Sequence, residues 1–79
     1  MMISEIRRLA ENHSLEDLQK GADSFERERF NALNVKGSDE GDILSNYLAA
    51  LYVKEHMAQG QSLTEAIRHY SSRVRSILS

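Results

Sequence analysis

"YLAALYV", residues 47–53, is an unbroken apolar run in a short and otherwise polar chain. A helix on a protein surface interrupts such a run with charged residues, because only one of its sides faces the core. A helix that is apolar on all sides must instead be covered on all sides. The run therefore predicts a central helix that begins near Ser38 or Asp39 and ends near Ala58.

The two sides of this central helix lead to different expectations. At 100° per residue, one broad face carries five apolar side chains: Ile43, Leu44, Tyr47, Leu48 and Leu51. We expect the core of the chain to cover this face. Ala49, Tyr52 and Val53 point the other way, with His56 at their rim, and soluble monomers avoid exposing such a contiguous patch. We predict that these four residues form a contact surface between two subunits; the alternative is that the first helix covers them.

The length of 79 residues fits a single domain, 1–79. The chain has no cysteine and no proline, so it cannot form a disulfide and can be helical almost throughout. Small folds usually need a further stabilising device, and a second copy of the chain would provide one. We therefore expect a homo-oligomer, in the form of a dimer.

Three further segments have helical spacing. The first carries Ile3, Ile6, Leu9 and Ala10 on one face. The second starts at the capping residue Ser14 and is expected to continue through Leu33, followed by a loop over residues 34–42. The fourth starts at the capping box "SLTE" (62–65), and its apolar stripe is Leu63, Ile67, Tyr70, Val74 and Ile77. The predicted fold is all-α, a compact bundle of three to four helices with an antiparallel C-terminal helical hairpin.

Charge and hydropathy narrow the classes of function. The formal net charge of -2 gives no general attraction to nucleic acid or anionic lipid. No apolar run approaches the roughly 20 residues of a membrane span, and the N-terminal stretch lacks a signal-peptide core. We expect a soluble, cytoplasmic protein. Arg68, Arg73 and Arg75 give the last helix a basic end, which supports an alternative function in nucleic-acid binding.

Residue types that carry chemistry occur without a known motif. Glu65 and His69 are four residues apart, and the hairpin would bring His56 level with Glu65. We expect this pair to be an ordinary solvent-exposed helix pair and not a metal site. No serine lies in a nucleophile motif, and the four glycines are too scattered for a phosphate loop. We expect no catalytic residues, no cofactor and no metal.

Three stretches resemble a family of short, uncharacterised bacterial proteins that contain a domain of unknown function: "ENHSLEDL" (11–18), "EGDILSN" (40–46) and "GQSLTEAIRHYSSRV" (60–74). The resemblance implies a small helical domain without known catalytic residues, so it assigns no site residues. Together with the apolar central helix, it leads us to expect a protein-interaction or regulatory module that associates with itself or with a protein that the sequence does not identify.

Overall fold

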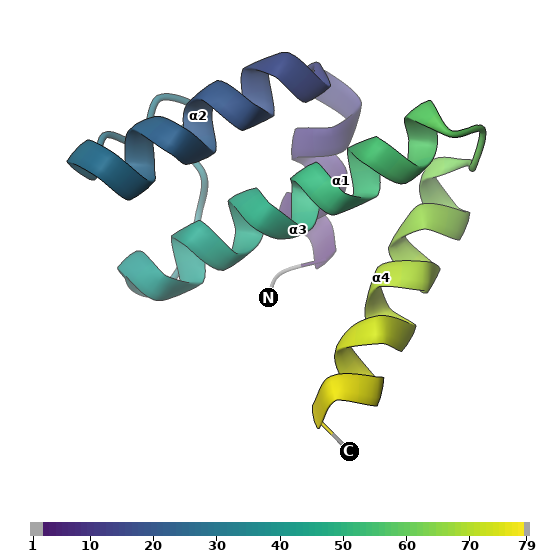
Figure 1. Ribbon diagram of the computed structural model, residues 1–79. Coiled ribbons are helices and arrows are strands. Elements are labelled where there is room, and N and C mark those ends of the chain that lie inside the picture. Colours follow the sequence, from purple (N-terminus) through teal and green to yellow (C-terminus); the bar gives the residue numbers. More distant parts are fainter. Residues whose placement is uncertain (1–2, 79) are drawn as a thin grey trace.

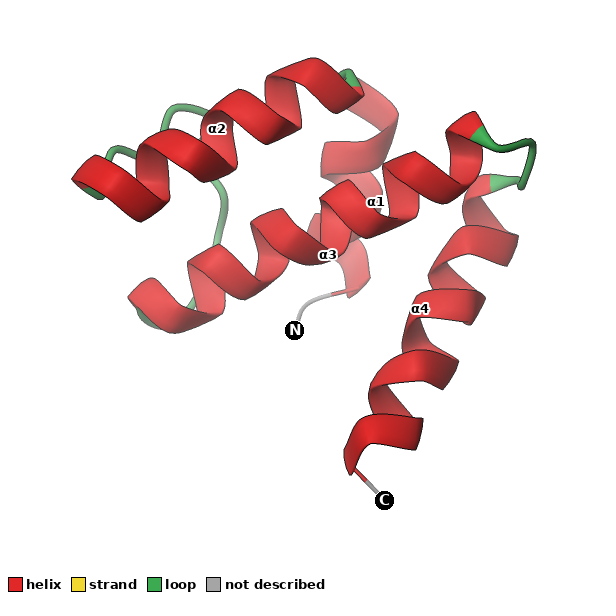
Figure 2. Cartoon of the chain, in the orientation of Figure 1, coloured by secondary structure: helices red, strands yellow, loops and turns green. Residues whose placement is uncertain are grey.

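The computed structural model describes the backbone of residues 3–78 and the side chains of residues 3–75. The elements are α1 (Ile3–Asn12), α2 (Leu15–Glu28), α3 (Glu40–Ala58) and α4 (Leu63–Leu78). Residues 3–78 contain no strand, so the predicted all-α bundle is confirmed (Figures 1 and 2). The Ile77 side chain, predicted to extend the stripe of α4, lies outside the described residues.

Helix α3 is the central element, and it contacts each of the other three helices. In Figure 1, α2 runs above α3, α1 lies behind it, and α4 descends from its C-terminal end. The core forms two clusters on different sides of α3. One contains Leu9, Leu18, Ala22, Phe25, Val35, Tyr47 and Ala50. The other contains Ile6, Ala10, Ala49, Val53, Ala66 and Ile67.

One chain is enough to complete this core. The molecule exposes 4944 Å², and the usual scaling of surface with mass gives about 4,900 Å² for a folded monomer of this size. An obligate dimer, whose subunits cannot fold alone, would leave an excess of exposed surface in the single chain. The expected dimer is therefore not needed to cover α3.

The helix starts follow the local signals. The Ser14 side chain accepts a hydrogen bond from the Asp17 amide at 3.1 Å and caps α2. Asp39 caps α3 in the same way through the Asp42 amide at 2.8 Å. At α4 the capping box is complete, because Ser62 and Glu65 each bond the backbone amide of the other, at 3.2 and 3.1 Å.

Helix α2 ends earlier than its apolar pattern predicts, at Glu28 instead of near Leu33. Arg29 adopts the left-handed conformation, with φ 59°, and terminates the helix. Its guanidinium donates to the carbonyls of Phe25 and Glu26 and to the carboxylate of Glu40, the first residue of α3. The loop thus runs over residues 29–39, and Leu33 packs on the core from the loop.

Two asparagine side chains, Asn46 buried and Asn31 half-buried, hold this loop on the helices. The Asn31 side chain bonds both backbone groups of Val35 and accepts from the Tyr47 hydroxyl at 2.6 Å. Asn46 donates to the Lys36 carbonyl at 2.7 Å. These hydrogen bonds fix the direction in which the loop enters α3. They thereby determine which sides of α3 face the other helices.

The last two helices are joined by a tight turn at residues 59–62, in which Gly60 has φ +106°. The chain reverses direction there, as the predicted hairpin requires. In Figure 1, α4 then diverges from α3 towards its own C-terminus. As a result, α4 covers the C-terminal half of α3 only.

Candidate protein-binding surface

Two of the four predicted interface residues belong to the core of the single chain. Ala49 and Val53 are 0% exposed. They pack in the cluster formed by residues of α1 and α4, which includes Ile6 and Ala66. Ala49 and Val53 are therefore covered within the single chain, by α1 as the alternative expectation has it and also by α4. A contact of these two residues with a second subunit stays a prediction, and the single chain does not need it to cover them.

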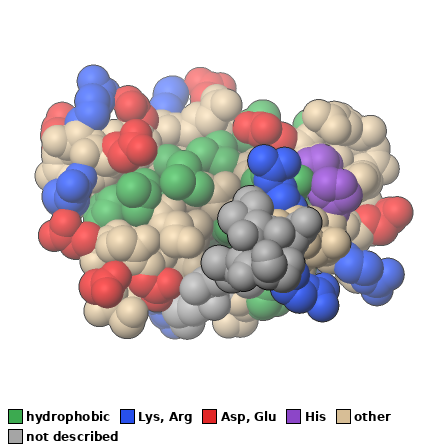
Figure 3. All heavy atoms as spheres, turned by 60° about the horizontal axis from the view of Figure 1, so that its bottom comes forward, with side chains coloured by type: hydrophobic (Ala, Val, Ile, Leu, Met, Phe, Trp, Pro, Cys, Tyr) green, Lys and Arg blue, Asp and Glu red, His purple; other side chains and the backbone are tan. Residues whose placement is uncertain are grey.

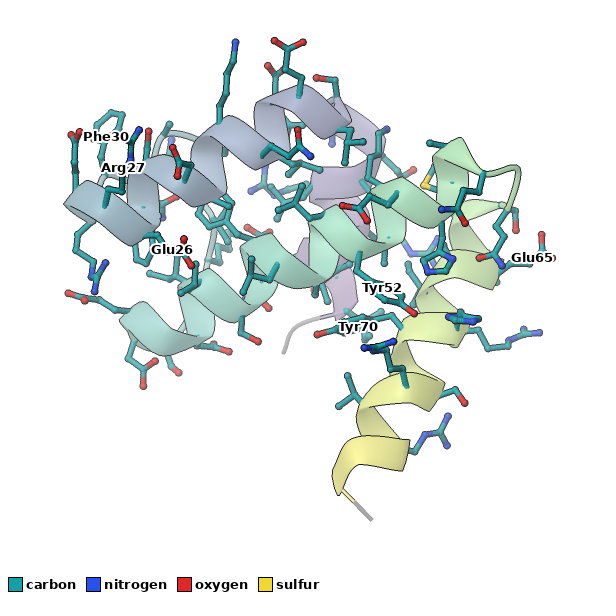
Figure 4. All side chains as sticks on the ribbon, viewed as in Figure 1. Glu26, Arg27, Phe30, Tyr52, Glu65 and Tyr70 are labelled. Atoms are coloured by element: carbon teal, nitrogen blue, oxygen red, sulfur yellow. The ribbon has the colours of Figure 1, made fainter. Side chains whose placement is uncertain are left out.

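Tyr52 and His56, the other two predicted interface residues, are half-buried in an aromatic cluster between α3 and α4. The Tyr52 ring centroid lies 4.4 Å from that of His56 and 5.2 Å from that of Tyr70. The Tyr52 hydroxyl is 2.9 Å from Nδ1 of His69. Figure 4 shows Tyr52 and Tyr70 pointing towards each other from the two helices.

This aromatic cluster fixes α4 against α3. Burial raises the pKa of the Tyr70 hydroxyl, so Tyr70 stays neutral over the physiological range. The Arg73 guanidinium carbon lies 5.6 Å from the Tyr52 ring centroid, in cation–π contact with it. The cluster therefore ends in a positive charge at the edge of the uncovered part of α3.

The uncovered side of α3 carries Leu44, Leu48 and Leu51, which we call the leucine stripe. Leu48 is 47% exposed, and Leu44 and Leu51 are half-buried at the margin of the first core cluster. Their spacing of four and three residues places them on one side of a helix. Figure 3 shows hydrophobic side chains gathered in a band on the corresponding face.

Sequence reasoning placed the leucine stripe on the face covered by the core. Of this face, the first core cluster buries Tyr47 completely, at 0% exposed, and covers Ile43, Leu44 and Leu51 in part. The broad face is wider than one packed helix, so its far edge remains in solvent. The exposed leucines could have been inferred from the width of the apolar face of α3. The residues on the opposite side of the helix, such as Ala49 and Val53, did not indicate them.

Charges of both signs border the leucine stripe. At its N-terminal end, Glu40 pairs with Arg29 at 2.8 Å, and Asp39 caps the helix beside them. At its C-terminal end lie exposed Glu55 and the Arg73 guanidinium. A partner on this surface would thus meet apolar contacts at the centre and ionic contacts at both ends, as in ordinary protein interfaces.

The chemistry-bearing residues near the turn do not form a metal centre. Among the described residues, no three His, Asp or Glu side chains are placed to hold a metal ion. The Glu65 carboxylate accepts from the Ser62 amide, and this hydrogen bond lowers the pKa of Glu65. Glu65, His69 and Ser72 instead line a shallow hollow of about 340 Å³ on α4, together with Gln61 and Arg68.

The described helices also lack a membrane span, since none of them is long and apolar enough to cross a bilayer. Fold and surface together define a small four-helix protein whose most distinctive exposed feature is apolar. The chain belongs to the family of unknown function DUF6952, whose model matches residues 1–79. The search of curated proteins gave no match. The search of solved structures gave none either.

Proposed function

We propose that this chain is a protein-interaction module that acts by binding another chain through the leucine stripe, and not by catalysis. The observation that carries the proposal is the 47% exposure of Leu48 on a helix whose other sides are buried. One exposed leucine is ordinary on a protein surface. A stripe of three along a helix, bordered by charges, matches the way an amphipathic helix is recognised.

The energy available at this surface suits reversible binding. Burying a fully exposed leucine contributes about 1.5–3 kcal/mol. The three leucines are already partly buried, so each would contribute only a fraction of that value. Arg73 adds a charged contact that steers the partner more than it tightens the complex. We therefore expect a regulated or transient contact instead of a permanent assembly.

A photo-crosslinking experiment in the native cell tests this proposal. A photoreactive phenylalanine analogue at position 48 should form a discrete protein adduct after illumination. The same analogue at position 30 is the matched control, because Phe30 is 62% exposed and lies beyond the end of α2, at the far end of the molecule from Tyr52 (Figure 4). Adducts of equal yield and pattern at both positions, or none at position 48, would contradict the proposal.

A nucleic-acid partner is our second proposal. Arg68, Arg73 and Arg75 are exposed on α4, and none of them forms an ion pair with another described residue. Exposed guanidinium groups of this kind suit phosphate contacts. A mobility-shift titration with duplex DNA, repeated at rising salt, tests it. Binding that weakens steeply with salt and is lost in Arg68→Ala would favour it; no shift at low salt would rule it out.

A further inference from the structure

We infer that the leucine stripe binds the leucine stripe of a second copy of this chain, with the two α3 helices antiparallel about a two-fold axis. The inference rests on the proposed function and names its partner. It differs from a dimer through Ala49 and Val53, because those residues are covered within the chain. A two-fold interface uses the same surface on both copies, so that surface must be complementary to itself.

The apolar part of the stripe meets this condition. Leu48 is at the centre of the stripe, with Leu44 one turn before it and Leu51 one turn after it. In an antiparallel pair centred near Leu48, each Leu48 faces its own copy. Leu44 of one copy then lies against Leu51 of the other copy, and the two-fold axis repeats this contact on its other side. Each leucine therefore meets a leucine, and no polar group is left opposite the apolar centre.

The charges decide the direction of the pair. A parallel pair would place Arg73 beside Arg73 of the second copy, and Glu40 beside its Glu40. The antiparallel pair instead brings Arg73 to the end that carries Asp39 and Glu40. It also brings Glu55 to the end that carries Arg29, which already pairs with Glu40. Each end of the antiparallel dimer then holds two cations, Arg29 and Arg73, among three carboxylates, Asp39, Glu40 and Glu55, whereas the parallel pair sets like charges side by side; the antiparallel orientation is therefore favoured.

Binding to a second copy would also have the low affinity that the proposed transient contact requires. Small domains without disulfides or metals gain stability from association, and this chain has no cysteine. The single chain is nonetheless a complete folded unit, and the stripe is short. An interface of this kind belongs to the small, weak class. We expect monomer and dimer to exchange, with the dimer populated from micromolar to millimolar concentration.

Light scattering after size exclusion gives the first test. The apparent mass of the wild type should rise from that of the 9.0 kDa chain towards twice that value as the protein concentration is raised. Leu48→Asp should keep the monomer mass throughout, because it places a carboxylate at the two-fold axis. Phe30→Asp, a change of the same kind outside the stripe, should behave like the wild type. A wild type that stays monomeric at millimolar concentration would overturn the inference.

Cysteine crosslinking then tests the geometry. Because the chain has no cysteine, Leu48→Cys introduces a single thiol. Packed helices have axes about 8–10 Å apart, and each Cα atom lies about 2.3 Å from its axis, so Cα atoms that face each other come within the roughly 7 Å that a disulfide spans. Under mild oxidation Cys-bearing chains should therefore join rapidly at position 48. Phe30→Cys should join at least tenfold more slowly, and equal rates would contradict an interface centred on Leu48.

The outcomes separate this inference from the proposed function. A monomeric wild type that still gives a position-48 photo-adduct heavier or lighter than two chains would overturn the second copy but keep the binding surface. A dimer that persists in Leu48→Asp would overturn both. A dimer that is lost in Leu48→Asp and crosslinks at position 48 supports both.

Discussion

At the scale of one residue, the Glu5 carboxylate joins helix α1 to the loop before α3. Its side chain is 3% exposed and accepts two hydrogen bonds from Arg8, at 2.8 and 2.7 Å. It also accepts from the Lys36 amide at 2.7 Å. The Arg8 hydrogen bonds lower the pKa of Glu5, and the Lys36 amide adds to the effect. Glu5 thereby fixes the loop before α3 to α1.

We predict that Glu5→Gln lowers the free energy of unfolding at pH 7 by about 1–2 kcal/mol. The value is modest because Arg8 is 37% exposed, and solvent screens the pair. Since the folded-state pKa lies below the ordinary 4.5, the stabilisation is complete above pH 4.5 and is lost as the pH falls through the lowered value. Urea unfolding of both proteins along a pH series measures this.

The matched control is Glu16→Gln. Glu16 pairs with Lys20 at 3.0 Å, but both side chains are about three-quarters exposed. This change should alter the unfolding free energy by less than about 0.5 kcal/mol. If Glu5→Gln were as silent as the control, or if its effect persisted unchanged in acid, the role assigned to Glu5 would be refuted.

Gly21 is a second residue whose size matters. A Cβ atom at this position would lie 2.9 Å from Cε1 of Tyr47 and 3.2 Å from Leu33. Tyr47 cannot yield easily, because it is buried and its hydroxyl is bonded to Asn31. We predict that Gly21→Ala destabilises the protein, since overpacking of about 1–3 kcal/mol exceeds the gain of about 1 kcal/mol in helix propensity.

Gly41→Ala provides the comparison for this glycine. A Cβ atom at Gly41 meets only the Asp39 side chain, at the ordinary distance of 3.4 Å. The propensity gain should then appear without a clash, so this variant should be as stable as the wild type or more so. Thermal unfolding followed by circular dichroism compares the two. A rise in melting temperature for Gly21→Ala would show that α2 and α3 are not in close approach.

At the scale of a single element, the local sequence of α4 determines where the helix begins. The reciprocal Ser62–Glu65 hydrogen bonds fix where α4 starts. We predict that Ser62→Ala costs about 1 kcal/mol, because one amide of the first turn loses its partner. Ser72→Ala, in the exposed middle of the same helix, should be neutral or slightly stabilising. An unchanged denaturation midpoint for Ser62→Ala would argue against the cap.

The starts of the helices were predictable from the sequence because a cap involves residues three apart. The end of α2 was not. Its apolar pattern continues to Leu33, but Arg29 adopts the left-handed conformation and its guanidinium reaches Glu40 of α3. That contact joins two helices across the loop, and no periodic pattern records it. Long-range contacts of this kind outweigh local propensity.

At the scale of the whole molecule, the all-α fold and the central position of α3 follow from one apolar run. Which side of α3 stays open does not. Ala49 and Leu48 are neighbours in a run that is apolar on every side, so hydropathy cannot distinguish them. The paths of α1 and α4 make the distinction, because they cover Ala49 and Val53 and leave Leu48 exposed. The candidate site therefore required the structure.

The claim that Val53 is core and Leu48 is surface is tested most directly by one pair of variants. Urea unfolding of the wild type and both variants should be followed by circular dichroism at the same low micromolar concentration, where association contributes least. Val53→Asp should lose about 3–5 kcal/mol or fail to fold, because it buries an uncompensated charge. Leu48→Asp should lose at most about 1 kcal/mol. Equal losses, or a larger loss for Leu48→Asp, would contradict the placement of α3 and of the binding surface.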